Sequence, residues 1–409
     1  SLVKKGYLVE HKEVDNKYAN AYKTIQPQAI GFISYPYEWT FGQLKDAALL
    51  TLYIQKAALK KEMSLKDASA YNVQIEKGKP VFIDTLSFEK YEEGKPWVAY
   101  KQFCQHFLAP LALASYTDIR AFQLLKSNID GIPLDLASKL LPSKTKLKFS
   151  LATHIHWHAR TQEKYAGKQT NEKKGRGVSK MAMLGLIDNL ISAVKSLQWK
   201  PKGTEWGEYY TFTNYSNSSF DEKKKLVEQY IEKADAKSLW DLGANDGTFS
   251  SIAALKGIPT VAFDIDPIAV EKNYRRVRQD KIDMLPLQLD LTNPSNSIGW
   301  AHEERDSLAD RGKVDVVMAL ALIHHIAISN NVPLKKVAEY LSKLGQHVII
   351  EFVPKEDSQV QILLATREDI FVDYHLEGFE EAFKTYFDVV DKQVVGDSVR
   401  TLYLLKSKN

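Results

Sequence analysis

Residues 237–266 constrain the fold of this chain more than any other stretch. An apolar run that ends near Asp241 is followed by a turn, a helical pattern and a second apolar run that ends at Asp264. The turn contains Gly243, Asn245 and Gly247. Glycine and asparagine adopt positive φ more readily than other residues, so backbone N–H groups in such a turn can approach a ligand closely. The stretch therefore predicts a strand, a turn, a helix and a strand, a unit that can hold a nucleoside.

The spacing of this motif distinguishes two nucleoside ligands. A dinucleotide site has the pattern G-x-G-x-x-G, with a helix N-terminus facing the pyrophosphate. Here the pattern is D-x-G-x-N-x-G, and the carboxylate of Asp241 would repel a pyrophosphate but would suit the cationic methionine end of S-adenosylmethionine. The carboxylate of Asp264 is placed to accept hydrogen bonds from two ribose hydroxyls. A turn that serves packing alone is the other interpretation of this motif.

The motif resembles the first motif of the class I S-adenosylmethionine-dependent methyltransferases, in which apolar residues precede Asp or Glu and alternating glycines. Asn245 stands in place of the middle glycine. The resemblance implies S-adenosylmethionine as the cofactor, held by Asp241, Gly243, Asn245, Gly247 and Asp264. It also implies that Asp290, the acid that ends a third short strand, accepts a hydrogen bond from the adenine amino group. An ordinary turn aspartate is the alternative for Asp290.

Further apolar segments follow, rich in Val and Ile, at residues 314–323 and 347–352, and helical patterns separate them. Such segments predict a parallel sheet that is covered by helices on both faces. Two closing strands are predicted at 386–390 and 398–405. The order of elements over residues 205–409 resembles the whole methyltransferase fold, which implies an α/β, Rossmann-like, doubly wound sheet.

Length and composition set the domain organisation and the compartment. A chain of 409 residues is too long for one ordinary core, so we expect a mainly helical N-terminal domain over 1–200 and a methyltransferase domain over 205–409. No uncharged apolar run reaches the roughly 18 residues that a membrane helix requires, and the first five residues lack the apolar core of a signal peptide. The single cysteine, Cys104, excludes an internal disulfide and fits a reducing compartment. We therefore expect a cytoplasmic protein.

The charge and the histidines bear on partners and metals. A net charge of +4 is small for this size and argues against nucleic acid as a partner, and a small-molecule acceptor is expected instead. The oligomeric state stays open. His154, His156 and His158 would share one face if this stretch were a strand, as in a metal site. No acid or cysteine nearby completes a ligand set, so we expect no metal and interpret the histidines as lining a polar domain interface.

The N-terminal half contains a second notable pattern. Helical spacing of apolar residues predicts helices at 40–61, 97–114, 118–125 and 181–197. Between the first two lie Asp67, Asn72 five residues later, a predicted hairpin, and Asp84 at the end of its second strand. Residues 30–160 resemble a kinase C-lobe, with residues 31–39 as the hinge. The resemblance implies that Asp67 orients an acceptor hydroxyl and that Asn72 and Asp84 hold metal-bound phosphates.

The kinase pattern is incomplete. Lys66 precedes Asp67 where kinases have Arg or Gly, and only about 30 residues precede the hinge, too few for a nucleotide-binding N-lobe. We therefore expect no phosphoryl transfer by this chain, with the N-lobe either upstream of Ser1 or lacking altogether. A simple turn before a hairpin is the alternative interpretation of Asp67 and Asn72.

The end of the fourth predicted strand bears on the methyl acceptor. His324 and His325 follow it, where amino-directed methyltransferases have Asn/Asp-Pro-Pro-Tyr/Phe, which disfavours an adenine or glutamine amide nitrogen as acceptor. An acceptor hydroxyl must lose a proton, and histidine suits that task near neutral pH. We expect His325, and His324 second, as the catalytic base, with packing or capping as the alternative role.

Two further segments, with three candidate residues, are predicted to line the acceptor side. Glu351 comes at the end of the fifth strand, at the edge where ligands collect in doubly wound sheets, with Asp357 in the loop after it. Tyr215 belongs to an aromatic segment over 204–215 that precedes the first strand. The resemblance to methyltransferases implies a lid over the donor there, and packing on the N-terminal half is the alternative. The predicted function is methyl transfer from S-adenosylmethionine to a small-molecule or glycan hydroxyl. The alternatives are an RNA or protein methyltransferase, or a bifunctional or regulatory protein whose N-terminal domain binds a nucleotide or a partner.

Overall fold

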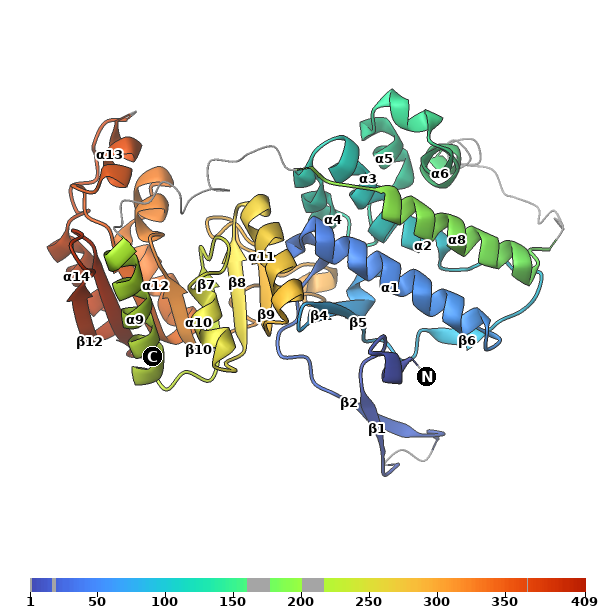
Figure 1. Cartoon of the computed structure of the whole chain (residues 1–409), viewed down its shortest axis with the longest axis horizontal. Coiled ribbons are helices and arrows are strands. Elements are labelled where there is room, and N and C mark those ends of the chain that lie inside the picture. Colours follow the sequence, from blue (N-terminus) through green and yellow to red (C-terminus); the bar gives the residue numbers. More distant parts are fainter. Residues whose placement is uncertain (1, 17–19, 160–176, 201–216, 366) are drawn as a thin grey trace. The chain divides into compact units, whose positions relative to one another are not determined.

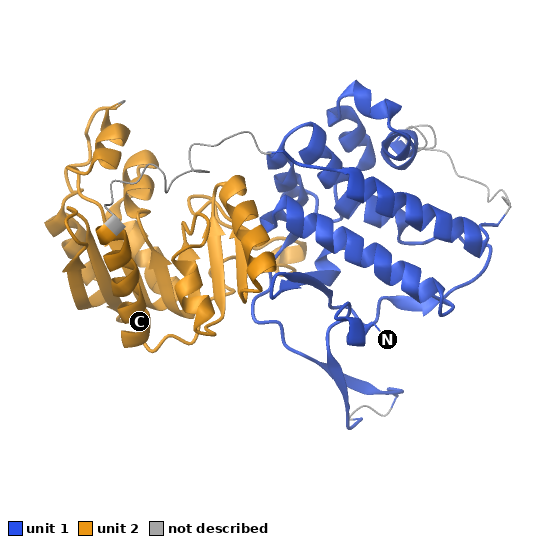
Figure 2. Ribbon diagram, viewed as in Figure 1, with its two compact units in different colours: residues 1–202 blue, residues 203–409 orange. Residues whose placement is uncertain are grey.

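The structure is a computed structural model that describes residues 2–16, 20–159, 177–200, 217–365 and 367–409. The chain divides into two compact units, residues 1–202 and residues 203–409, which Figure 2 shows in different colours. Each unit contains its own set of buried apolar side chains.

Two long helices pack against each other in the N-terminal unit (Figure 1): α1 (Phe41–Leu59) and α8 (Lys180–Ser196). Thr40 begins α1, because its hydroxyl accepts a hydrogen bond from the Gln43 N–H while the Gln43 side chain accepts one from the Thr40 N–H. Lys45 donates to the carbonyl of Leu197 just beyond α8, at a helix end whose carbonyls lack partners within the helix. Both predicted helices are thus confirmed.

Shorter helical segments complete this unit: α2 (Tyr100–Phe103), a π-helix (Cys104–Leu108), α3 (Ala109–Tyr116), a 3-10 helix (Ile119–Gln123), α4 (Leu124–Ser127), α5 (Leu134–Leu140), a 3-10 helix (Ser143–Leu147), α6 (Phe149–Leu151) and a π-helix (Ala152–Trp157). The described residues also form three antiparallel strand pairs: β1 (His11–Val14) with β2 (Thr24–Pro27), β3 (Met63–Leu65) with β6 (Phe88–Lys90), and β4 (Val73–Glu76) with β5 (Lys79–Phe82). The last pair confirms the predicted hairpin.

A seven-stranded mixed sheet forms the centre of the C-terminal unit: β7 (Leu239–Leu242), β8 (Thr260–Asp264), β9 (Met284–Gln288), β10 (Val314–Ala319), β11 (Gly345–Phe352), β12 (Phe387–Val394) and β13 (Thr401–Ser407). The spatial order is β9-β8-β7-β10-β11-β13-β12 (Figure 1). The first five of these strands are parallel, and β13 is antiparallel to both of its neighbours. The order β9-β8-β7-β10-β11 is that of a doubly wound sheet, and the antiparallel closing pair makes it methyltransferase-like, as predicted.

Three helices cover one face of this sheet: α9 (Asn217–Lys233), α10 (Ser250–Leu255) and α11 (Pro267–Asp280). Val227 of α9 lies in one apolar cluster with Leu239 of β7 and Ile349 of β11. Val277 of α11 packs with Ala262 of β8 in a second cluster. Leu239 and Ala262 point to the same face, because Leu239 pairs in register with Thr260 and side chains alternate along a strand.

The other face carries α12 (Leu334–Leu344) and α14 (Leu376–Lys384). Phe379 of α14 contacts Tyr403 of β13 and Phe352 of β11, with ring centroids 5.1 Å and 5.0 Å apart. The short α13 (Ser358–Leu364) follows β11. Parallel Val- and Ile-rich strands thus lie between two helical layers, as expected for a sheet buried on both faces.

The outer strand β12 is mostly exposed and irregular. Its register with β13 shifts between Val389 and Asp391. Three charged side chains on this strand form ion pairs with neighbouring elements: Asp388 with Lys408, Asp391 with Lys233, and Lys392 with Glu380.

Candidate functional site

The carboxyl ends of β7, β8, β10 and β11 lie at one edge of the sheet, because these strands are parallel. This edge carries the predicted residues of β7 and β8, of the turn after β7, and of the segments at the ends of β10 and β11. The sheet therefore brings together residues that are more than 100 positions apart in the chain.

The turn after β7 has the predicted backbone conformation. Gly243, Asn245 and Gly247 all have positive φ, at +81°, +50° and +77°. A Cβ at Gly247 would lie 2.4 Å from the side-chain amide nitrogen of Asn273 on α11, so only glycine fits there without movement. A Cβ at Gly243 would lie 3.1 Å from Leu322. The turn is therefore held close to its neighbours, with its backbone at the edge of the sheet.

Asp264 is the last residue of β8 and shapes this turn. One carboxylate oxygen accepts the Asn245 N–H at 2.7 Å, and the other accepts the Asp266 N–H at 2.8 Å. Burial raises the pKa of Asp264 to about 6, while these hydrogen bonds oppose the rise. Each carboxylate oxygen has two lone pairs, so acceptor capacity remains for ligand hydroxyls.

Asp241 is the most unusual group of the site. Its side chain is 1% exposed, and its Oδ2 accepts the Ser250 hydroxyl at 2.5 Å. Its Oδ1 has no hydrogen-bond partner among the residues that the structure describes. Burial, with the charge of Asp264, raises the pKa of Asp241 to about 7, while Ser250 and Lys223 oppose the rise. A buried acceptor of this kind lacks a donor, which a ligand can supply.

The structure places Asp290 beyond the strand instead of at its end. Strand β9 ends at Gln288, and the Oδ1 of Asp290 accepts the N–H and the hydroxyl of Thr292 at 2.8 Å and 2.6 Å. These bonds form a turn of the kind that aspartate commonly makes. Asp290 thus forms a turn two residues after the strand, and its role towards the adenine amino group stays a prediction.

His324 and His325 follow β10, and their ring centroids are 4.1 Å apart. His324 is buried and its Nδ1 has no hydrogen-bond partner in the described part of the chain. Burial, followed by the charge of Arg400, lowers the pKa of His325 to about 4. Burial, His325, Arg400 and Lys223 lower the pKa of His324 well below its ordinary value. Both rings are therefore neutral at neutral pH and can accept a proton, although only weakly. Ala321, just before them, has a φ of +49°, a strained conformation for a residue with a Cβ.

The predicted acceptor residues have different surroundings. Glu351 lies within β11, fully buried, and its Oε2 accepts the Lys223 ammonium at 2.7 Å. Glu351 thus does not lie in a surface loop, and its carboxylate belongs to a buried ion pair. Asp357 begins α13 and binds the buried Arg400 guanidinium with both oxygens, at 2.7 Å and 3.1 Å. Tyr215 lies outside the described residues.

Lys223 and Arg400 are site residues that the sequence analysis does not identify. Arg400 belongs to no motif. Lys223 does carry a signal, because it occupies the apolar stripe of α9 at helical spacing from Phe220, Val227 and Tyr230. A lysine in such a stripe must be either buried with a partner or at the rim of the core.

In the N-terminal unit, the structure brings Asn72 and Asp84 together. The Asn72 side-chain amide donates to the Ser87 hydroxyl at 3.3 Å, and this hydroxyl donates to Asp84 at 2.5 Å. Asp67 accepts the N–H of Ser69 at 2.9 Å in a turn. The resemblance to a kinase C-lobe stays a prediction.

His154 and His156 lie on a π-helix and His158 follows it directly in helical conformation, so these residues do not alternate along a strand as the metal-site alternative requires. The ring of His154 forms hydrogen bonds with the Tyr100 hydroxyl at 2.7 Å and with Asn189 at 2.8 Å. His156 lies between the hydroxyls of Ser138 and Thr145. The described residues contain no group of three or more side chains that could hold a metal ion.

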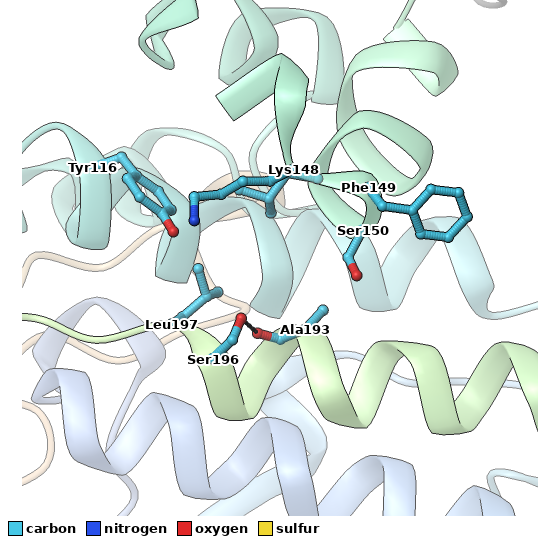
Figure 3. A pocket seen from close by; sticks show the side chains of 8 residues that line it. Tyr116, Lys148, Phe149, Ser150, Ala193, Ser196 and Leu197 are labelled. Carbon is cyan, nitrogen blue, oxygen red and sulfur yellow. Dashed lines mark hydrogen bonds between the residues drawn. The ribbon is translucent and has the colours of Figure 1, made fainter. Parts of the chain in front are cut away.

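The N-terminal unit also has a hollow of about 150 Å³, shown in Figure 3. Two contacts join residues that line this hollow. The Lys148 ammonium lies 5.4 Å from the centroid of the Tyr116 ring, and the Ser196 hydroxyl donates to the Ala193 carbonyl. The volume is below the roughly 300 Å³ at which small-molecule sites begin. None of the residues predicted to act on a ligand lines it: the lining consists of Tyr116, Lys148, Phe149, Ser150, Leu151, Ala193, Ser196 and Leu197.

The strand order, the glycine turn and the carboxylates at the ends of β7 and β8 define a methyltransferase-like α/β unit that makes up about half of the chain. No family model matches the sequence. The nodulation protein NoeA of Rhizobium meliloti (strain 1021) is 36% identical over 412 residues, which cover 98% of this chain and 87% of that protein. The chain therefore belongs to the family of the nodulation protein NoeA.

Three solved structures resemble about half of the chain. The PH0226 protein from Pyrococcus horikoshii OT3 is 17% identical and has a TM-score of 0.35, and the match covers 50% of this chain and 100% of that protein's chain. The N-methyltransferase NodS from Bradyrhizobium japonicum WM9 is 10% identical, covers 47% with 99% of its own chain, and has a TM-score of 0.33. Magnesium protoporphyrin IX methyltransferase (ChlM) from Synechocystis PCC 6803, with bound SAH, is 14% identical, covers 49% with 93% of its own chain, and has a TM-score of 0.34. The similarity is low, and the fold assignment rests on the strand order of the sheet itself. No described helix is long and apolar enough to span a membrane.

Proposed function

We propose that the C-terminal unit binds S-adenosylmethionine and transfers its methyl group to a hydroxyl of a small molecule or glycan. The observation that carries this proposal is the buried carboxylate of Asp241, whose Oδ1 has no hydrogen-bond partner among the described residues. A cationic ligand group would satisfy this oxygen, and the methionine end of S-adenosylmethionine carries one. A pyrophosphate at the same place would be repelled.

Other residues at this edge suit the remaining parts of the donor. Asp264 has lone pairs left for ribose hydroxyls, and the turn from Gly243 to Gly247 presents its backbone beside it. Asp290 follows the next strand and is the proposed acceptor for the adenine amino group. The donor supplies an electrophilic methyl group on a sulfonium, so the protein mainly has to align the acceptor and keep water out.

We assign the proton transfer to His325. An acceptor hydroxyl loses its proton as its oxygen bonds to the methyl carbon, and a neutral imidazole can take that proton. His325 is less buried than His324, and it begins the π-helix at the end of β10. Its low pKa, about 4, keeps it in the proton-accepting form throughout the physiological range.

Calorimetric titration of the full chain with S-adenosylmethionine and with its demethylated product tests the donor site. We expect both to bind, and we expect Asp264→Ala to weaken both by at least about tenfold, since it removes a hydrogen-bonded ionised partner. Asp280→Asn, an exposed change at the end of α11, is the matched control and should bind normally. Wild-type protein that gives no heat with either compound would end the proposal.

The relative that is 36% identical is named a nodulation protein. We therefore propose extracts from cells grown under nodulation conditions as the first source of acceptor. The extracts are incubated with methyl-labelled donor and separated by size. Label in low-mass or glycan fractions supports the proposed acceptor, whereas label in a protein band or in RNA assigns the acceptor to one of the two alternative classes.

A second candidate function concerns the N-terminal unit, for which we propose nucleotide binding in a regulatory role. The observation that favours it is the juxtaposition of Asn72 and Asp84 through Ser87. Thermal melting with ATP and Mg²⁺, with Asn72→Ala as the comparison, tests it. A wild-type melting temperature that ATP and Mg²⁺ leave unchanged would exclude the proposal.

A further inference from the structure

Lys223 of α9 is a buried lysine next to the candidate site. Its side chain is 4% exposed, its Nζ lies 2.7 Å from the Glu351 carboxylate, and the same atom lies 4.9 Å from the centroid of the Phe249 ring. Phe249 immediately precedes α10, just after the glycine turn, and Glu351 is near the end of β11. Lys223 thus contacts both the donor side and the acceptor side of the edge.

The register of the sheet explains this position. Met318 of β10 pairs with Asp241 on one side and with Ile349 on the other. Side chains alternate along strands, so Asp241 and Glu351 point to the same face, the one that α9 covers. One strand separates them, which corresponds to roughly 10 Å across the sheet. A long side chain from α9 can serve both carboxylates.

The ion pair is not needed to attach α9 to the sheet. Leu226, Val227, Tyr230 and Ile231 of this helix are all buried in the apolar cluster of the sheet. Replacing a buried ion pair with apolar residues of similar volume is often neutral or stabilising, so such a pair is weak evidence for a role in stability. The two charges can therefore matter mainly through their effect on neighbouring side chains.

Those neighbours are the polar groups of the site. The Lys223 ammonium is within electrostatic reach of Asp241, Glu351 and Arg400, and it also acts on His324. Three groups influence the pKa of Asp241: the Ser250 hydroxyl and the Lys223 charge lower it, and the Asp264 charge raises it. The pKa of Lys223 itself is lowered by burial, which the Glu351 carboxylate opposes.

We propose that Lys223 is a positioning residue of the methyl-transfer site: from α9 it holds the Glu351 carboxylate in place and presents a positive charge to the sheet face that carries Asp241, the acceptor for the cationic end of the donor. This inference rests on the proposed function. Lys223 does not itself contact the reacting atoms. Its effect reaches the donor through Asp241.

The test is the pH profile of donor affinity in the full chain. In wild-type protein, affinity for S-adenosylmethionine rises with pH as Asp264, with a pKa of about 6, and Asp241, with a pKa of about 7, lose their protons. It falls again where the donor's own ammonium loses its proton. In Lys223→Met/Glu351→Leu, which removes both charges, we expect the rising limb to move to higher pH and the falling limb to stay. A displacement of the Asp241 pKa by one unit corresponds to about fivefold weaker binding at pH 7, because about half of Asp241 is ionised in wild-type protein and about a tenth in the variant. Lys223→Arg should keep the wild-type limb.

A matched pair on the same helix serves as the control. Lys233 and Asp391 also join α9 to a strand, with a distance of 2.7 Å, but their side chains are 47% and 29% exposed. Lys233→Met/Asp391→Leu should leave both limbs in place. If the buried double variant does not fold, as judged by thermal melting, Lys223→Gln/Glu351→Gln replaces it.

Two results would contradict the inference, and they are distinguishable. A folded buried double variant with an unmoved rising limb would show that the pair is only structural, while the proposed donor site would stand. Wild-type protein that binds neither the donor nor its demethylated product would remove the proposed function and this inference together.

Discussion

Asp241 is a buried acid whose second oxygen no described residue satisfies. Its pKa of about 7 lies above the value near 3.9 of an unfolded chain. The folded state therefore prefers the protonated form, and the ligand-free protein loses stability as the pH rises from about 4 to about 7, after which the loss is complete. Above about pH 7, Asp241 therefore lowers the unfolding free energy of the ligand-free protein.

Asp241→Asn should remove this loss of stability. At pH 8 we expect the unfolding free energy of the ligand-free variant to exceed that of wild type by a few kcal/mol, the order of magnitude that such a pKa difference implies, and its melting temperature to be higher. The variant should lose donor affinity, because a neutral amide cannot form an ion pair with the donor's ammonium group. Melting curves at pH 5 and pH 8 measure the first effect, and equal melting temperatures of the two proteins at pH 8 would contradict it.

The histidine pair gives a kinetic prediction at the same scale. His325→Gln should lower kcat by about 10²- to 10⁴-fold, the usual contribution of a catalytic base. Since the pKa of His325 is about 4, it stays neutral above pH 5, so the variant should keep the acid limb of the wild-type pH profile, which belongs to Asp241 and Asp264. Turnover of methyl-labelled donor across pH 5–8 measures both effects. A vanished acid limb in the variant would instead assign that limb to His325.

Among the elements, the turn after β7 is the least tolerant of change. Gly247→Ala forces a Cβ towards the buried Asn273 amide and places alanine at a φ of +77°. We expect a loss of at least about 1–2 kcal/mol in unfolding free energy, with weaker donor binding. Gly185→Ala in α8, where a Cβ meets open space, is the control and should stabilise slightly. Denaturant unfolding and calorimetry measure the pair, and an unchanged Gly247→Ala protein would contradict the description of the turn.

The elements also show what the sequence can and cannot predict. Buried parallel strands and the turn from Gly243 to Gly247 follow local rules of composition and backbone conformation, so they were predictable. The ion pair of Lys223 with Glu351 joins residues 128 positions apart, and no local pattern encodes which strand a helix will cover. The metal-site alternative for His154, His156 and His158 depended on a strand, and no local pattern excluded that strand, whereas the segment is helical in the structure.

At the scale of the whole molecule, the two units have separate cores. We expect two transitions in differential scanning calorimetry, of which S-adenosylmethionine raises only one. At a concentration 100 times its Kd, the donor should add about 2.7 kcal/mol to the unit that binds it. Donor-induced shifts of both transitions together would show that the units unfold as one.

The outer strand β12 has a consequence for how copies of the chain meet. Exposed backbone at the rim of a sheet can act as a template for cross-β stacking, and Val389, Val390 and Val394 make this strand apolar enough to invite it. An incoming chain would have to follow a shifted register and disturb three ion pairs. The register shift and the charged side chains of β12 are thus features of the kind that disfavour edge-to-edge pairing between copies of a chain.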